Sequence, residues 1–146
     1  MPVLREMQAR PRQFESISIV TSQHTDLLDP LLDLFSIHAD HRLGVMRPGQ
    51  SLDQLLGRLM MALAPTLDEC QPDVILVQGD TTSALAGALA AHHRRIPLVH
   101  VEAGLRSGAR YNPFPEEMNR RLITQLATLH MAATERNVET LIAEGV

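Results

Sequence analysis

Two short segments contain residues whose types and order suit anion binding and proton transfer. Gln78-Gly79-Asp80-Thr81-Thr82 combines a glycine, a carboxylate and two hydroxyl residues, and Glu102-Ala103-Gly104-Leu105-Arg106 combines a carboxylate with a guanidinium. Glycine and small hydroxyl residues at the start of a helix present free N–H groups to an anion. The first segment lacks the Gly-Lys-Ser/Thr of a P-loop, so we do not expect that kind of phosphate loop.

Simpler structural roles compete for the carboxylates of these segments. Asp80 could cap a helix by accepting a hydrogen bond from the N–H of Thr82 or Ser83. Glu102 ends an apolar run, and a carboxylate there is costly unless it is paired or faces a solvated cleft. A salt bridge from Glu102 to Arg106 is therefore the alternative to a catalytic role.

A third acidic segment begins at Pro115 and places Glu116 and Glu117 in the first turn of a predicted helix. The helix macrodipole and i,i+4 pairing with Arg120 and Arg121 explain both residues without any catalysis. A catalytic role is favoured because Asp80, Glu102 and Glu116 are all predicted to lie at the same edge of one sheet. Carboxylates there can transfer protons when their surroundings separate their pKa values.

The histidines give no convincing metal site, because no pair of them has the spacing of metal ligands. His92 and His93 lie at the end of a predicted helix, and His38 and His41 lie in a polar loop. Gln23 and His24 end a strand at the same sheet edge, where they could either touch a ligand or cap a helix. We expect no metal and no cofactor.

Strand and helix patterns alternate along the chain. The predicted strands are 16–21, 73–78 and 97–102, and the predicted helices are 2–7, 27–35, 51–67, 81–93, 115–126 and 134–145. A Ser51 and Gln54 capping box opens the clearest helix. Alternation with short links predicts an α/β fold with a doubly wound parallel sheet, and ligands bind such sheets beyond the carboxyl ends of their strands.

The composition excludes several classes of partner. The 146 residues have a net charge of −4 and only 3% aromatic residues, which argues against nucleic acid. One cysteine, Cys70, precludes an intramolecular disulfide. The longest uncharged apolar stretches, 59–67 and 81–91, are shorter than the ~20 residues that span a bilayer. We therefore expect a cytoplasmic protein without a membrane segment.

Together, the motifs resemble those of the bacterial non-hydrolysing UDP-N-acetylglucosamine 2-epimerases. The similarity is carried by 78–82, by 100–106, by Pro115-Glu116-Glu117-Met118-Asn119-Arg120, and by 21–24 and 46–50. The resemblance implies a Rossmann-like domain, one half of a GT-B fold that holds a sugar nucleotide between two domains. Residues 1–146 would then be part of the N-terminal domain, without its first strand and without the second domain.

The same resemblance implies an isomerase that interconverts UDP-N-acetylglucosamine and UDP-N-acetylmannosamine. A base removes the C2 proton, UDP leaves by anti elimination, and re-addition on the other face completes the reaction. The implied residues are Asp80, Glu102 and Glu116 for proton transfer, Arg106, Asn119 and Arg120 near the substrate, and Gln23 and His24 in a regulatory site for a second UDP-N-acetylglucosamine. A homodimer, or association with the missing second domain, and a role in cell-surface polysaccharide synthesis are implied as well.

Two other functions fit the same residues. The chain could be a sugar-nucleotide-binding or regulatory module without catalysis, or a fragment of a GT-B glycosyltransferase. A glycosyltransferase would not require three carboxylates at these strand ends. Exchange of the sugar C2 proton with deuterated water distinguishes the epimerase from both alternatives.

Overall fold

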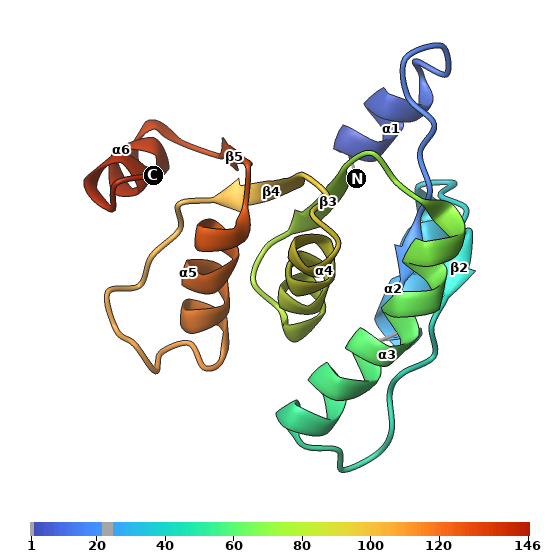
Figure 1. Cartoon of the computed structure of the whole chain (residues 1–146), viewed down its shortest axis with the longest axis horizontal. Coiled ribbons are helices and arrows are strands. Elements are labelled where there is room, and N and C mark those ends of the chain that lie inside the picture. Colours follow the sequence, from blue (N-terminus) through green and yellow to red (C-terminus); the bar gives the residue numbers. More distant parts are fainter. Residues whose placement is uncertain (1, 22–24) are drawn as a thin grey trace. The chain divides into compact units, whose positions relative to one another are not determined.

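The computed structural model describes residues 2–21 and 25–146, which form two compact units divided after Pro48 (Figure 1). Gln23 and His24 lie outside the described residues, so their predicted regulatory role stays a prediction. No helix in the described part of the chain is long and apolar enough to cross a membrane.

The first unit, residues 1–48, is built around a short pair of parallel strands. Its elements are α1 (Pro2–Gln8), β1 (Ile19–Val20), α2 (Thr25–Leu34) and β2 (His41–Arg42). Strand β1 pairs with β2, and the Ser18 N–H donates to the Asp40 carboxylate at 2.6 Å. The strand expected at 16–21 is thus only two residues long, and β2 falls in the predicted polar loop.

The second unit, residues 49–146, contains the α/β alternation that the sequence predicts. Its elements are α3 (Leu52–Cys70), β3 (Ile75–Gln78), α4 (Thr82–His93), β4 (Leu98–Ala103), α5 (Glu116–Leu126), β5 (Leu129–Ala132) and α6 (Glu135–Ala143). Strands β3, β4 and β5 form a parallel sheet in that order. The predicted parallel α/β architecture is confirmed, and β5 is a strand that the sequence patterns did not reveal.

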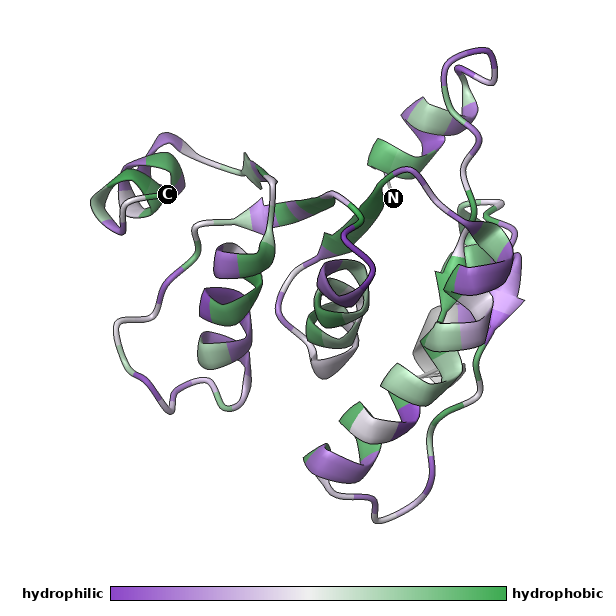
Figure 2. Cartoon of the chain, viewed as in Figure 1, coloured by the Kyte–Doolittle hydropathy of each residue, from purple (hydrophilic) through white to green (hydrophobic). Residues whose placement is uncertain are grey.

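Helix α4 lies between α3 and α5 and packs against both of them (Figure 1). Hydrophobic residues dominate β3, β4 and most of α4 (Figure 2). The buried side chains Ala88 of α4, Leu98 of β4 and Ile123 of α5 belong to one apolar cluster, which fixes the two helices against the sheet. This packing sets the position of the N-terminus of α5 relative to the ends of β3 and β4.

Side-chain caps set the starts of several helices. The Ser51 and Gln54 capping box is present as predicted, and Thr134 caps α6. At α4 the cap is Thr81, whose Oγ1 accepts from the Ala84 N–H at 3.2 Å. The N-cap of α4 is therefore Thr81 rather than Asp80, and the Asp80 carboxylate pairs with Arg120.

Candidate active site

The turn after β3 holds Asp80 at the carboxyl edge of the sheet. Gly79 adopts a left-handed φ of 72°, a conformation that glycine tolerates without strain. The Gly79 N–H donates to the Val101 carbonyl at 3.1 Å, and His100 Nε2 donates to the Gly79 carbonyl at 2.8 Å. Strand β4 thus holds both the N–H and the carbonyl of Gly79, the residue immediately before Asp80.

Two consecutive residues of α5 hold Asp80 from the other direction. Asn119 Nδ2 donates to the Asp80 carbonyl at 2.8 Å, and Arg120 Nη2 donates to Asp80 Oδ2 at 2.5 Å. Asn119 and Arg120 are both buried. Helix α5 therefore fixes both the main chain and the carboxylate of Asp80, and three of the predicted site residues meet here.

Glu102 lies next to this turn, near the end of β4. Its φ of 70° is unusual for a residue other than glycine, and the pairing of β4 with β5 shifts register between Val101 and Ala103. Glu102 is exposed, and its Oε2 lies 3.6 Å from where a Cβ on Gly79 would be. Its carboxylate thus borders the residue before Asp80.

The salt bridge considered between Glu102 and Arg106 does not form. Arg106 instead donates to both carboxylate oxygens of Glu144, with Nε at 2.9 Å and Nη2 at 2.6 Å, and its Nη2 also donates to Thr124 Oγ1 at 3.1 Å. The hydrogen bonds from Arg106 lower the pKa of Glu144 below its ordinary value. The role of Arg106 near the substrate stays a prediction, because the buried Arg106 side chain is already paired with Glu144, which is itself partly exposed.

Glu116 is the first residue of α5 and is half-buried. Among residues 2–21 and 25–146, no hydrogen bond or ion pair engages the carboxylates of Glu116 and Glu102. Of the two glutamates, only Glu117 binds the arginines predicted as helix partners, and Arg120 also binds Asp80. The pairing expected from helical spacing is therefore right for Glu117 and wrong for Glu116.

His100 is fully buried beneath the Asp80 turn, and the sequence patterns did not single it out as a site residue. Burial lowers its pKa below the ordinary value of 6.5, and the nearby charges of His130 and Arg106 act in the same direction. The hydrogen bond to Gly79 and the charge of Asp80 act in the opposite direction without reversing the shift. A neutral imidazole with its proton on Nε2 matches the observed bond.

The carboxyl edge of β3 and β4 thus brings together an ion-paired carboxylate, Asp80, and an exposed one, Glu102, with Glu116 one helical turn before Arg120. Within the described part of the chain, no group of three or more His, Cys, Asp or Glu side chains could hold a metal ion. The arrangement suits proton transfer by carboxylates.

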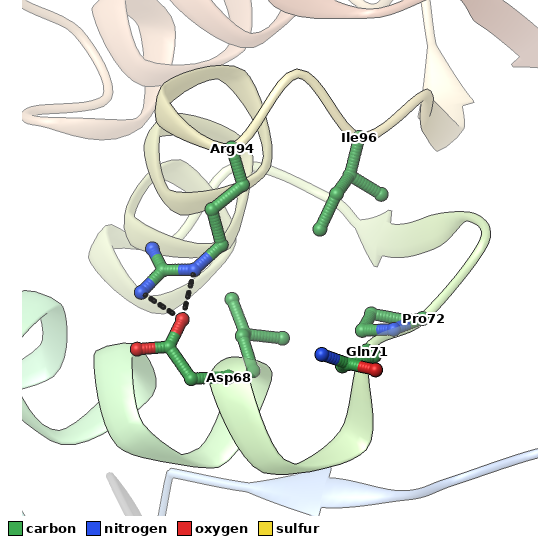
Figure 3. Close-up of a pocket in the computed structure, with 6 residues that line it drawn as sticks. Asp68, Gln71, Pro72, Arg94 and Ile96 are labelled. Carbon is green, nitrogen blue, oxygen red and sulfur yellow. Dashed lines mark hydrogen bonds and ion pairs between the residues drawn. The ribbon is translucent and has the colours of Figure 1, made fainter.

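A shallow hollow lies at the opposite edge of the sheet, where α3 and α4 end (Figure 3). Asp68 of α3 pairs with Arg94 across it at 2.9 Å, and the lining residues are Leu67, Asp68, Gln71, Pro72, Arg94 and Ile96. Pro72 and Ile96 precede β3 and β4, so this hollow is at the amino ends of the strands. It is separate from the candidate site.

A parallel sheet covered by helices is the architecture of a Rossmann-like domain, and the polar side chains gather at the carboxyl edge, where such sheets bind their ligands. A sequence profile of the UDP-N-acetylglucosamine 2-epimerase family matches residues 5–146. The chain belongs to this family.

Individual relatives agree with this assignment. The UDP-N-acetylglucosamine 2-epimerase of Escherichia coli K12 is 50% identical over 133 residues, which are 91% of this chain and 35% of the relative. The crystal structure of the Neisseria meningitidis enzyme bound to UDP-GlcNAc has a TM-score of 0.95 and 41% identity, covering 99% of this chain and 39% of that one. The chain therefore spans well under half the length of these relatives, and its predicted likeness to half of a GT-B fold is confirmed.

Proposed function

We propose that this chain contributes the proton-transfer edge of a non-hydrolysing UDP-N-acetylglucosamine 2-epimerase. The observation that carries the proposal is the pair of carboxylates at adjacent strand ends. Asp80 is fixed by Arg120 and Asn119, whereas Glu102 is exposed and has no hydrogen-bond partner among the residues that the structure describes. Structures of relatives in complex with UDP-GlcNAc support the choice of substrate.

The proposed reaction requires groups that take and return one proton. A carboxylate removes the proton from C2 of the sugar, the C–H electron pair forms the C1=C2 bond, and the C1–O bond breaks with its electrons on UDP. UDP then adds back to C1 of 2-acetamidoglucal while a proton reaches the other face of C2, which gives UDP-N-acetylmannosamine. Asp80, Glu102 and Glu116 are the residues assigned to these transfers.

Further parts of the proposal concern the cellular setting. We place the enzyme in the cytoplasm, as a homodimer or joined to a second domain, where it supplies an amino sugar for cell-surface polysaccharide. A single cysteine, half-buried and without a second for an intramolecular disulfide, is compatible with a reducing compartment.

A chimera that joins this chain to the remaining sequence of the Escherichia coli relative tests the activity. In deuterated water it should convert UDP-N-acetylglucosamine to UDP-N-acetylmannosamine with deuterium at C2, observed by proton NMR. Exchange at C2 is the decisive measurement, because it reports breakage of the C–H bond directly.

A chimera that folds and binds UDP-N-acetylglucosamine without C2 exchange would refute the proposal. Binding alone would indicate a sugar-nucleotide-binding module. Transfer or hydrolysis of the sugar with the C2 proton retained would indicate a glycosyltransferase.

A further inference from the structure

Glu117 is a fully buried carboxylate that the predicted site does not use. Its Oε2 accepts from the Ser107 N–H at 2.9 Å and from Arg120 Nη1 at 3.3 Å, and its Oε1 accepts from Arg121 Nε at 2.9 Å. Burial alone would raise the pKa of Glu117, but the bonds from Ser107 and Arg121 outweigh it and lower that pKa. Glu117 is therefore a buried negative charge with three donors.

Arg120 is the link between Glu117 and the candidate site. One terminal nitrogen of its guanidinium, Nη1, binds Glu117, and the other, Nη2, binds Asp80. The Arg120 side chain is only 8% exposed, and its Nε has no hydrogen-bond partner within the described residues. Two carboxylates on the two terminal nitrogens thus determine how the guanidinium plane is oriented.

The Ser107 bond connects Glu117 to the second candidate carboxylate as well. Ser107 lies five residues after Glu102, in the segment that leaves β4, and its N–H shares Glu117 Oε2 with Arg120. One carboxylate oxygen therefore ties the chain after Glu102 to the side chain that holds Asp80. Glu117 itself is three residues before Arg120 on α5, so the helix places these two side chains next to each other.

We propose that Glu117 is a positioning residue that fixes the Arg120 guanidinium against Asp80 and the segment after Glu102 against α5. The inference rests on the proposed function, because it concerns the carboxylates assigned to proton transfer. Reacting groups must be held in a narrow range of positions, and a displacement of 1 Å can cost about 10²-fold in rate. Glu117 supplies that constraint without touching the substrate.

The first test uses the 146-residue chain and does not depend on activity. In nitrogen-15 NMR spectra, the Arg120 Nη protons should give separate, slowly exchanging signals, because charged partners restrain both nitrogens. Glu117→Gln keeps the size of the side chain but removes its charge, so these protons should exchange about tenfold faster or more. Unchanged Arg120 signals in Glu117→Gln would overturn the proposal.

The matched control is Arg121→Gln, which removes the more exposed partner of Glu117 and leaves the Arg120 contact in place. The Arg121 side chain is 41% exposed, compared with 8% for Arg120. In this variant the Arg120 signals should stay separate and protected. Loss of the Arg120 signals to the same extent as in Glu117→Gln would mean that general loosening of α5, rather than Glu117, controls the guanidinium.

The second test measures kinetics in the chimera described above. Glu117→Gln should lower kcat by ~10-fold to 10²-fold with KM changed less than about twofold, because the substrate contacts stay and the reacting geometry is lost. Glu117→Asp keeps the charge on a shorter side chain and should recover part of kcat. A purely structural role predicts lower stability with unchanged kcat per folded molecule.

Arg120→Lys keeps a positive charge but cannot bind two carboxylates with two fixed nitrogens, so it should lower kcat as Glu117→Gln does. This variant answers the question even if Glu117→Gln does not fold. Wild-type kcat in Glu117→Gln or in Arg120→Lys, beside an impaired Asp80→Asn, would refute the positioning role and leave the proposed function intact. No C2 exchange in the unmodified, folded chimera would instead refute the function, while the NMR result on Arg120 would stand.

Discussion

Asp80, Glu102 and Glu116 are the same kind of acid in three different surroundings. Asp80 is paired with Arg120, Glu102 is exposed beside Gly79, and Glu116 is half-buried at the start of α5. Chemistry that takes a proton from one face of a sugar and returns it to the other needs groups that differ in this way. The observed differences favour separate roles for the three side chains.

Replacing each acid by its amide should separate catalysis from structure. In the chimera, Asp80→Asn, Glu102→Gln and Glu116→Gln should each lower kcat by the ~10² to 10⁴ that is typical of general acid–base groups. C2 exchange measured in deuterated water provides the rate. Asp68→Asn, at the opposite edge of the sheet, is the control and should retain wild-type turnover. Full turnover in all three amide variants would leave these acids with structural roles only.

His100 should make folding stability depend on pH in a predictable direction. Its pKa is lowered in the folded chain, so below 6.5 the unfolded chain binds more protons and the folded state loses stability as the pH falls towards the folded pKa. Above 6.5 this contribution to the pH dependence disappears. The Tm of the wild type should thus fall more steeply with acidification below pH 6.5 than the Tm of His100→Gln, as measured by circular dichroism, and parallel curves would contradict the assignment.

The sequence indicated candidate site residues but not the partners that hold them. Asp80 was recognised from its place after an apolar run, but its partner Arg120 is 40 residues away and local patterns do not show such a contact. The same holds for Arg106 and Glu144, which are 38 residues apart. Helical spacing did reveal the pairing of acids with arginines on α5, although it could not tell which glutamate is buried.

At the scale of elements, strong periodicity, caps or a continuous apolar run made the long helices and the strands β3 and β4 predictable. The capping box at Ser51 and the apolar run before Gln78 both correspond to observed elements. Strands β2 and β5 were missed because they are short and carry no β-branched residue, so only pairing with a neighbouring strand defines them.

The contact between α6 and the end of β4 depends on Gly104. This glycine has a φ of 84°, and a Cβ added to it would lie 2.3 Å from the Asn137 carbonyl oxygen of α6. Gly104→Ala should therefore lower the free energy of unfolding by at least ~2 kcal/mol through overpacking and left-handed strain. Urea denaturation measures the change.

Gly57→Ala is the matched comparison, because Gly57 lies inside α3 and an added Cβ would have no atom within 4 Å. It should raise the free energy of unfolding by ~0.5 to 1 kcal/mol, since alanine favours a helix over glycine. Equal effects of the two substitutions would show that the close approach at Gly104 has no energetic importance.

At the scale of the whole molecule, the chain spans only 35–39% of the length of the relatives described above. A cleft that surrounds a substrate can contribute ~7 to 11 kcal/mol of barrier reduction through proximity alone. We expect the 146-residue chain by itself to show no C2 exchange and no UDP-N-acetylmannosamine, and any binding of UDP-N-acetylglucosamine to be weak, around ~1 mM. Saturable turnover by the purified chain would contradict this expectation.

The long segment between β4 and α5 is a place where a protease can cut the chain. Arg110 is exposed within it, as are the residues on both sides, so trypsin can reach the bond after Arg110. Three interactions join the chain before Arg110 to the chain after it, and none of them involves Arg110. They are the pairing of β4 with β5, the packing of α5 on α4 and the bond between Asp80 and Arg120. A nicked protein would therefore keep its two fragments together, and the pieces before and after Arg110 are natural partners for fragment complementation.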